Sequence, residues 1–332
     1  MTKIAGGEAA ADVSRAICAS VSQVRGSVMD ELFQLRNRAC AAGGPEARVR
    51  GALMHVSGWF VLWLEGEHEA VEATLQRAAG DPRNAHQKIL HRSRGPATLA
   101  EALTVAATQG VGGPAAFGRR IFELKAQHMQ GIHHEPAQLW QRLSAPCLPM
   151  AGALASPDHH TVLVSAEDNG PIDLLRKLAD RSGGTMVYQR FAGGRQNTAD
   201  VGAAYVDIAT GGQVRRIQLL SRRALGFRIV HQSLANLDAL LMLLGSRPSS
   251  AIELASSVAS LLDALPSRPS ICLLTRNGEV DCSIGAALHA RMRGVSEVTT
   301  VDESQLAPWL LGVEPAPGTP AIAQRPPGLA CA

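Results

Sequence analysis

Tyrosine is almost absent from this chain, and aromatic residues as a whole are scarce. Aromatics make up 4% of the 332 residues, and the only two tyrosines are Tyr188 and Tyr205. No tyrosine therefore precedes residue 188. A site in the first half of the chain cannot use a phenol as electron or proton donor.

Strong charge, paired cysteines and long apolar runs are also lacking. The net charge is +3 and the basic residues are scattered, which argues against a nucleic-acid partner. The six cysteines show no CxxC spacing, and without a signal-peptide pattern we interpret them as reduced cytosolic thiols. The longest apolar run, residues 239–244, is far below the roughly 18 residues that a membrane span needs. We therefore expect a cytoplasmic protein with no membrane and no nucleic-acid contact.

The most informative stretch is GALMHVSGWFVLWLEG, residues 51–66. It lies within two apolar runs, residues 49–56 and 59–64, that are too short for helices and suit strands. Ser57-Gly58 between them supplies the permissive backbone of a two-residue hairpin. The sequence therefore predicts a β-hairpin.

The flanking segments complete a simple order of elements. Residues 67–79 place apolar residues at helical spacing, and Pro82 stops that helix. Ser27 with Asp30 three residues later predicts the start of an earlier helix. With strands at residues 14–20 and 87–90, the order is β-α-β-β-α-β. The fold class is α/β, and this first domain, residues 13–114, is predicted to be a ferredoxin-like α+β domain with two helices on one face of its sheet.

The stretch RGALMHVSGWFVLWLEGEHEAVEATLQRAAGDPRNAHQKIL resembles the core of the BLUF family, flavin-binding blue-light sensors. The shared pattern is a glycine, an apolar strand, a turn, a phenylalanine, Leu-Glu-Gly, a helix and Asp-Pro-Arg. The resemblance covers about one hundred residues and implies FAD as a cofactor. It also implies that Glu65-Gly66, Asp81 and Arg83 are structural rather than photochemical positions.

The chain departs from the family at its working positions. The family uses a first-strand tyrosine as electron donor, a third-strand glutamine and an asparagine near the second strand. Cys18, Leu62 and the segment Gly44-Pro45-Glu46 stand there instead. Each lost hydrogen bond to a flavin removes roughly 1 kcal/mol. We expect the photochemistry to be lost, while an apolar slot lined by Cys18, Leu62 and Trp63 could still take a flavin or another flat ligand.

Residues 115–143 carry apolar residues at helical spacing and are predicted to be the C-terminal helices of the first domain. Their apolar surface suggests a homodimer formed through them or through the first domain. A metal site could be suggested by a cluster of three histidines and a glutamate: His128, His133, His134 and Glu135. Glycine and proline interrupt this stretch and the spacing is not HExxH, so we predict no metal.

A second domain follows a proline-rich linker at residues 144–160. Over residues 161–313 strands alternate with helices, which predicts a mostly parallel sheet with helices on both faces. Strands are expected at residues 161–164, 186–191, 203–207, 216–220, 237–244, 271–274 and 297–301. Helices are expected at residues 171–179, after a cap at Ser250, and at residues 283–292 and 306–311.

This order resembles a Ras-like small GTPase of the bacterial type related to gliding-motility GTPases, a three-layer α/β P-loop fold. Gly170 remains of the phosphate-binding loop, but Pro171 stands at the lysine position and Ile172 at the magnesium-ligand position. Arg223 replaces the switch II glycine, and Thr275 to Gly278 lacks the base-recognising aspartate. Three lost charge-assisted bonds of about 1.5–3 kcal/mol each remove several powers of ten in affinity. We expect a pseudo-GTPase.

No set of catalytic residues emerges elsewhere. Asp200 and Asp207 are interpreted as solvated carboxylates. The pairs Arg215-Arg216 and Arg222-Arg223, which flank one strand, are interpreted as solvated side chains at its edge. Residues 314–332 are interpreted as a disordered tail.

We therefore interpret the chain as a non-enzymatic signalling or regulatory adaptor that has no resident cofactor and acts through an unknown protein partner, with a motility or signalling component as the candidate. The first alternative is an FAD-binding sensor with a non-standard or absent light response. A flavin- or nucleotide-dependent enzyme is a third hypothesis, for which the sequence offers no nucleophile–base pair or metal set.

Overall fold

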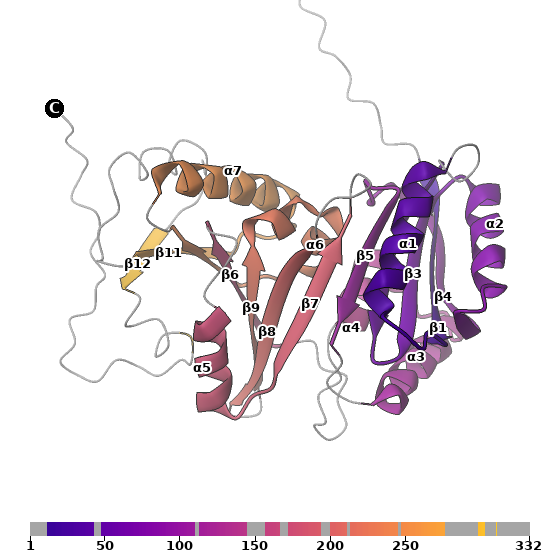
Figure 1. Cartoon of the computed structure of the whole chain (residues 1–332), viewed down its shortest axis with the longest axis horizontal. Coiled ribbons are helices and arrows are strands. Elements are labelled where there is room, and N and C mark those ends of the chain that lie inside the picture. The colour runs from indigo at the N-terminus through magenta and orange to yellow at the C-terminus, as the bar shows by residue number, and fades with distance from the viewer. Residues whose placement is uncertain are drawn as a thin grey trace, which may run out of the picture. The chain divides into compact units, whose positions relative to one another are not determined.

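The computed structural model describes residues 12–42, 48–109, 113–144, 157–166, 172–193, 200–210, 213–244, 247–275, 298–302 and 310 (Figure 1). Contacts divide the chain into two compact units. Unit 1 comprises Met1–Ser156, Val187–Gly202 and Phe227–Ser233, and unit 2 comprises Pro157–Met186, Ala203–Gly226 and Leu234–Ala332.

Unit 1 is built around one mostly antiparallel sheet with the order β7-β5-β2-β3-β1-β4. β1 pairs antiparallel with β3 and β4, and β2 pairs antiparallel with β3 and parallel with β5. Its elements are β1 (Asp12–Ser22), α1 (Val28–Ala41), β2 (Val49–Val56), β3 (Trp59–Gly66), α2 (His68–Ala79), β4 (Asn84–Pro96), β5 (Leu103–Thr108), α3 (Pro114–Met129), α4 (Pro136–Ser144), β7 (Met186–Ala192) and α6 (Arg228–Ser233).

The local signals of the first domain act as predicted. The Ser27 side chain caps α1 by accepting from the Asp30 backbone N–H at 3.3 Å. Ser57 and Gly58 have φ values of 48° and 77°, so both central residues of the β2–β3 turn are left-handed, as a type I′ hairpin requires. The predicted hairpin and the β-α-β-β-α-β order are confirmed.

The sheet of unit 1 buries both faces, because alternate residues of each strand point to opposite sides. Leu62 and Phe60 of β3 pack towards α1 and Cys18 of β1 packs with α2, which defines the α1–α2 face (Figure 1). Trp63 of β3 packs against Trp140 of α4, which defines the α3–α4 face. The predicted helices of residues 115–143 therefore cover the second face of the sheet.

Unit 1 differs from prediction at one edge of its sheet. β5 was not expected, because LTVAAT is short and only weakly apolar. The predicted strand at residues 186–191 is β7, and it pairs antiparallel with β5 from Val105 to Thr108. The predicted boundaries, 13–114 and 161–313, therefore do not match the units, since the free edge of β5 takes up a strand from later in the chain.

Unit 2 contains a mostly parallel sheet with the order β12-β11-β10-β6-β9-β8. Only β8 runs antiparallel to its neighbour among the described strand pairs of this unit. Its elements are β6 (His159–Ser165), α5 (Ile172–Ser182), β8 (Val201–Thr210), β9 (Gln213–Ser221), the 3-10 helix η2 (Arg222–Gly226), β10 (Ala239–Leu243), α7 (Pro248–Ala264), β11 (Ser270–Thr275) and β12 (Val298–Asp302).

Helices cover both faces of this sheet, as predicted. Leu163 of β6 and Leu241 of β10 pack with Leu175 and Leu178 of α5. The neighbouring buried residues of the same strands point to the other side, where α7 lies (Figure 1). α7 begins with Pro248 after Arg247 and has no side-chain cap, so the predicted cap at Ser250 is wrong; proline at the first helical position sets this helix start instead.

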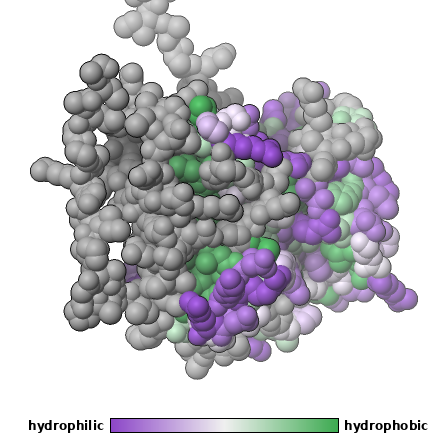
Figure 2. Space-filling view, turned by 60° about the vertical axis from the view of Figure 1, so that its left-hand side comes forward, coloured by the Kyte–Doolittle hydropathy of each residue, from purple (hydrophilic) through white to green (hydrophobic). Residues whose placement is uncertain are grey.

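Several predictions fall on segments that the structure does not describe. These are most of the linker at residues 144–160, the helix at residues 283–292, most of the helix at residues 306–311 and the tail at residues 314–332. Among the described residues no helix has the length and apolarity to cross a membrane. On the face seen in Figure 2, the coloured residues are largely hydrophilic, with hydrophobic residues in small patches.

Candidate functional site

A cavity of about 270 Å³ lies between α1, α2 and the sheet of unit 1. Ala39 of α1 and Ala78 of α2 form opposite walls, and Leu53, Leu62 and Leu103 form the apolar floor. We call this cavity the α1–α2 slot. Gly51 also lines it, and a Cβ there would lie 3.0 Å from the Leu103 side chain, so glycine keeps this part of the floor open.

Two of the three predicted slot residues meet on the floor. Cys18 of β1 lies directly opposite Leu62 of β3 in the antiparallel ladder, and both line the slot. Cys18 is buried, and burial raises the pKa of its thiol to about 11. The thiol is therefore protonated at neutral pH and is a poor nucleophile.

Gln87 is a slot residue that the sequence did not single out. Its Nε2 donates a hydrogen bond to the Cys18 Sγ at 3.2 Å, and this bond opposes the effect of burial on the thiol. β4 is irregular here: Val21 pairs with Ala85 and Ala19 with Lys88, while His86 has φ 55°. A bulge of this kind re-aims side chains, and no sequence signal marks it.

Trp63 does not line the slot, and its prediction as a slot residue is wrong. It follows Leu62 in β3 and therefore points to the α3–α4 face. Its side chain is fully buried, with ring centroids 5.9 Å from Trp140 at an interplanar angle of 47°. Trp63 is thus a core residue of unit 1.

The mouth of the slot carries charge. Arg38 of α1 and Arg77 of α2 line it together with Asp81 and Arg83. Arg83 donates to both carboxylate oxygens of Asp81, at 2.9 and 2.5 Å, and to Glu31 of α1 at 3.1 Å. Its hydrogen bond lowers the pKa of Asp81. Asp81 and Arg83 therefore tie the end of α2 to α1, in line with the structural role that the resemblance implies.

Glu65 and Gly66 also make contacts that hold the backbone in place. Glu65 is 1% exposed, and its Oε2 accepts the backbone N–H groups of Thr98 at 2.6 Å and Leu99 at 2.7 Å. A Cβ on Gly66 would lie 2.4 Å from the Arg48 carbonyl oxygen, closer than any side chain can approach. These residues fix the segment that leads from β4 into β5.

The predicted phosphate-loop positions are only partly described. Ile172 is the first residue of α5 and packs beside the core of unit 2, whereas Gly170 and Pro171 lie outside the described residues. Arg223 lies in η2, and of the base-recognition segment only Thr275, the last residue of β11, is described.

Asp207 is buried, contrary to its prediction as a solvated carboxylate. It forms a two-point ion pair with Arg216, with two N–O distances of 2.8 Å, and the guanidinium lies 4.3 Å from the Tyr205 ring centroid. Their positions opposite each other on β8 and β9 bring the charges together. Asp200 pairs instead with Arg190, Oδ2 to Nε at 2.6 Å, so both carboxylates hold arginines and neither is poised for acid–base chemistry.

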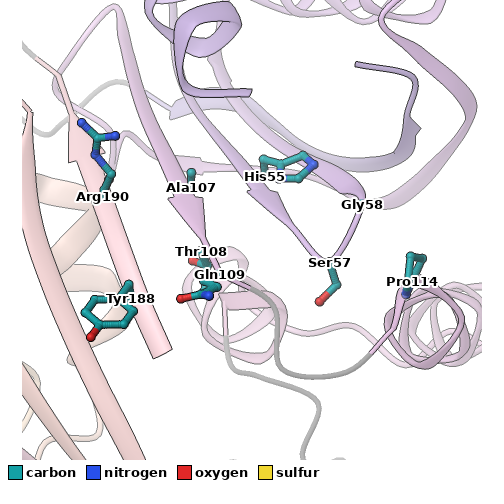
Figure 3. A pocket seen from close by; sticks show the side chains of 9 residues that line it. All are labelled: His55, Ser57, Gly58, Ala107, Thr108, Gln109, Pro114, Tyr188 and Arg190. Atoms are coloured by element: carbon teal, nitrogen blue, oxygen red, sulfur yellow. The ribbon is translucent and has the colours of Figure 1, made fainter. Parts of the chain in front are cut away.

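A second, more open cavity of about 520 Å³ lies near the β2–β3 turn (Figure 3). Ala107 of β5 pairs with His55 of β2 on one side and with Arg190 of β7 on the other, so a small residue lies between two large ones. Tyr188 also lines this cavity. Of the two tyrosines, Tyr188 is therefore here and Tyr205 is in unit 2, and neither is in the α1–α2 slot.

No group of three or more metal-ligating side chains is arranged to hold an ion within the described ranges. The three histidines singled out in the sequence come together in a different way: the His128 and His133 rings meet edge to face with centroids 5.6 Å apart, and His134 bonds to Gln127.

Comparison with known proteins gives a family match for the first part of the chain. The family model for sensors of blue-light using FAD (BLUF) matches residues 15–98. No curated protein matches the chain. Three solved structures that resemble it are the dark-state BLUF protein BlrB, a bacterial light-regulated adenylyl cyclase, and BlrP1 from Klebsiella pneumoniae in a manganese and cy-diGMP complex.

The likeness to these structures is limited. BlrB is 17% identical, covering 29% of this chain and 73% of its own, with a TM-score of 0.24. The cyclase is 12% identical, covering 62% and 78%, and BlrP1 is 12% identical, covering 86% and 74%; both have TM-scores of 0.27. Scores this low support no shared function. The family-model match, together with the strand order around the slot, supports a BLUF domain at residues 15–98.

Proposed function

We propose that this protein is a non-enzymatic signalling protein whose BLUF domain binds a flat ring, with a flavin as the best candidate, but does not perform the photochemistry of the family. The observation that supports it most is the α1–α2 slot, which stays open between two alanines although its polar family residues are replaced. A packed, collapsed core at this place would have left no such cavity.

The size of the slot limits what can enter. Its 270 Å³ lies just below the range of about 300 to 1,000 Å³ that is usual for ligand pockets. A ring system can fill it, while the rest of a dinucleotide stays at the mouth. Arg38 and Arg77 at the mouth are suited to phosphate groups.

The slot offers one neutral amide to the polar edge of a ring. Gln87 now bonds to Cys18, and its amide could turn to a ring carbonyl or nitrogen. A bound flavin would supply redox and light-absorbing chemistry. The protein would supply an apolar floor, the Gln87 amide and the cationic mouth.

Two features support the loss of photochemistry. No tyrosine lines the slot, and the Leu62 side chain has no atom that can donate or accept a hydrogen bond. The Cys18 thiol, with its pKa raised by burial to about 11, does not replace a phenol hydrogen-bonded to a glutamine. A ring held here would absorb light without a partner to pass the signal to the protein.

FAD binding to a slot-filling variant tests the proposal. Ala39→Phe places a ring in the slot, and Ala41→Phe adds the same ring at an exposed position on the same helix. We expect fluorescence titration to show FAD binding by the unmodified chain and the Ala41→Phe variant, and a Kd at least about tenfold higher for Ala39→Phe, equivalent to about 1.4 kcal/mol. Equal FAD affinities for the two variants would remove the slot as the binding site.

We also propose that the output is contact with another protein, a second copy of the chain included, in the cytoplasm. Its support is an exposed apolar surface on unit 1: Phe122, Met129 and Ile132 are 56%, 77% and 48% exposed. An adaptor needs such a surface and needs no catalytic group.

For unit 2 we propose a Ras-like fold that no longer handles nucleotide. A mostly parallel sheet with one antiparallel strand supports the fold. Ile172 supports the loss of function, because its aliphatic side chain packs beside the core and cannot coordinate magnesium.

A further inference from the structure

Four of the eleven histidines gather on the α3–α4 face of unit 1, at the end of α3. His91 comes from β4, His128 from α3, and His133 and His134 from the connection between α3 and α4. His134 contacts Gln127 at 2.8 Å and Arg142 at 3.4 Å. Residues 128–135 therefore place three imidazoles close to His91 of β4.

His91 is the buried member of this group, at 4% exposed. Its Nε2 is 2.7 Å from the Ser93 Oγ, and the Nε of Arg15 on β1 donates to the same hydroxyl at 3.0 Å. Arg15 lies flat against Gly95, where a Cβ would come within 2.7 Å of its Cζ. A fixed positive charge thus shares a hydroxyl with a buried imidazole.

The charges around His91 are nearly all of one sign. Arg15 faces it from β1, His128 from α3, and His133 and His134 from the connection. On β4 itself, Lys88 extends over the Phe122 ring and Arg92 pairs with Glu72. Glu135 approaches Arg15 at 3.6 Å but is 71% exposed, so water screens its charge.

We propose that residues 128–135, with His91 and Arg15 beneath them, form a pH-sensitive clasp that holds α3 and α4 on the sheet at neutral pH and loosens as the pH falls below about 6. A proton taken up by His91 adds a positive charge beside Arg15. Opening would uncover the face of the BLUF sheet opposite the slot, next to Phe122 and Met129, which are already exposed.

The direction of the pH dependence follows from His91. Burial is the main cause that lowers its pKa to about 4, and Arg15 and the three other histidines add to the shift. Because this value lies below the 6.5 of a free histidine, the clasp is most stable above pH 6.5 and loses stability as the pH falls from 6.5 towards 4. At pH 5.0 the opening equilibrium should rise about 30-fold over its value at pH 7.5.

Hydrogen exchange measured by mass spectrometry on the full chain tests this. After correction for intrinsic rates, we expect peptides from α3 and α4 to lose protection between pH 7.5 and 5.0 by about one order of magnitude or more. His91→Gln keeps a polar partner for Ser93 and cannot gain a proton, so most of the acid effect should disappear. His159→Gln, an exposed histidine of unit 2, should leave it unchanged.

A second variant allows the same test if His91→Gln fails to fold. His128→Gln combined with His133→Gln changes only side chains at or near the surface and should reduce the acid effect in part. Peptides from α5 and α7 report on unit 2 and should respond to neither variant. Unchanged protection of α3 and α4 at pH 5.0, or an acid effect that survives both variants, would overturn the clasp.

Discussion

Cys18, Leu62 and Gln87 decide what the slot can do at the scale of single residues. Two of them were identified from the sequence, because a family pattern assigns them positions on the first and third strands. The third required the structure, since Gln87 faces Cys18 only through the irregular pairing of β4 with β1. A sequence pattern gives the period of a strand but not the place of a bulge.

The Asp207–Arg216 pair shows the same limit of sequence-based prediction, here for the burial of a charged side chain. An aspartate in an alternating strand was interpreted as solvated, but its side chain is 3% exposed and that of Arg216 is 11% exposed. Burial of a charge depends on the partner on the neighbouring strand, which the local sequence does not name.

Asp207→Asn should therefore destabilise unit 2 strongly. It leaves the Arg216 charge buried without its carboxylate, which typically costs about 3–5 kcal/mol. Asp173→Asn, in an exposed pair with Arg176 on α5, should cost less than about 1 kcal/mol. Urea unfolding followed by circular dichroism measures the loss of stability in each of the two variants. Equal midpoints would mean that the buried pair adds nothing to stability.

At the scale of elements, local signals predicted most of unit 1. The hairpin follows from Ser57-Gly58, α1 from its Ser27 cap, and α2 from its spacing. β5 was missed and β7 was placed in the second domain for a common reason: a sheet edge is completed by whichever strand reaches it. That choice is made by contacts far apart in the chain.

α3 carries the predicted homodimer contact. Double replacement of Phe122 and Met129 by serine removes two exposed apolar side chains without touching the buried face of the helix. Multi-angle light scattering should give about twice 35.0 kDa for the unmodified chain and about 35 kDa for the variant.

Tyr188→Ser is the matched control for that experiment. Tyr188 is also a large, exposed side chain of unit 1, but it belongs to β7 and not to α3 or the connection that follows it. The control should retain the mass of the unmodified chain. A monomeric mass for the unmodified chain would contradict the homodimer and leave an unlike protein as the partner.

At the scale of the whole molecule, we propose that each unit keeps an architecture suited to a ligand while the residues that would engage the ligand are changed. In unit 1 the slot remains and its hydrogen-bonding pair is replaced by Cys18 and Leu62. In unit 2 the proposed Ras-like fold would keep its strand order, with Ile172 at the position proposed for the magnesium ligand. Under this proposal fold and chemistry are separable, and a binding surface is a sufficient reason to keep the fold.

The visible absorption spectrum of the full chain, after incubation with FAD and exhaustive dialysis, tests the central claim most directly. The account predicts a retained flavin band that does not shift when the sample is illuminated with blue light. A colourless protein would contradict binding in the α1–α2 slot, and a reversible red shift under blue light would contradict the loss of photochemistry.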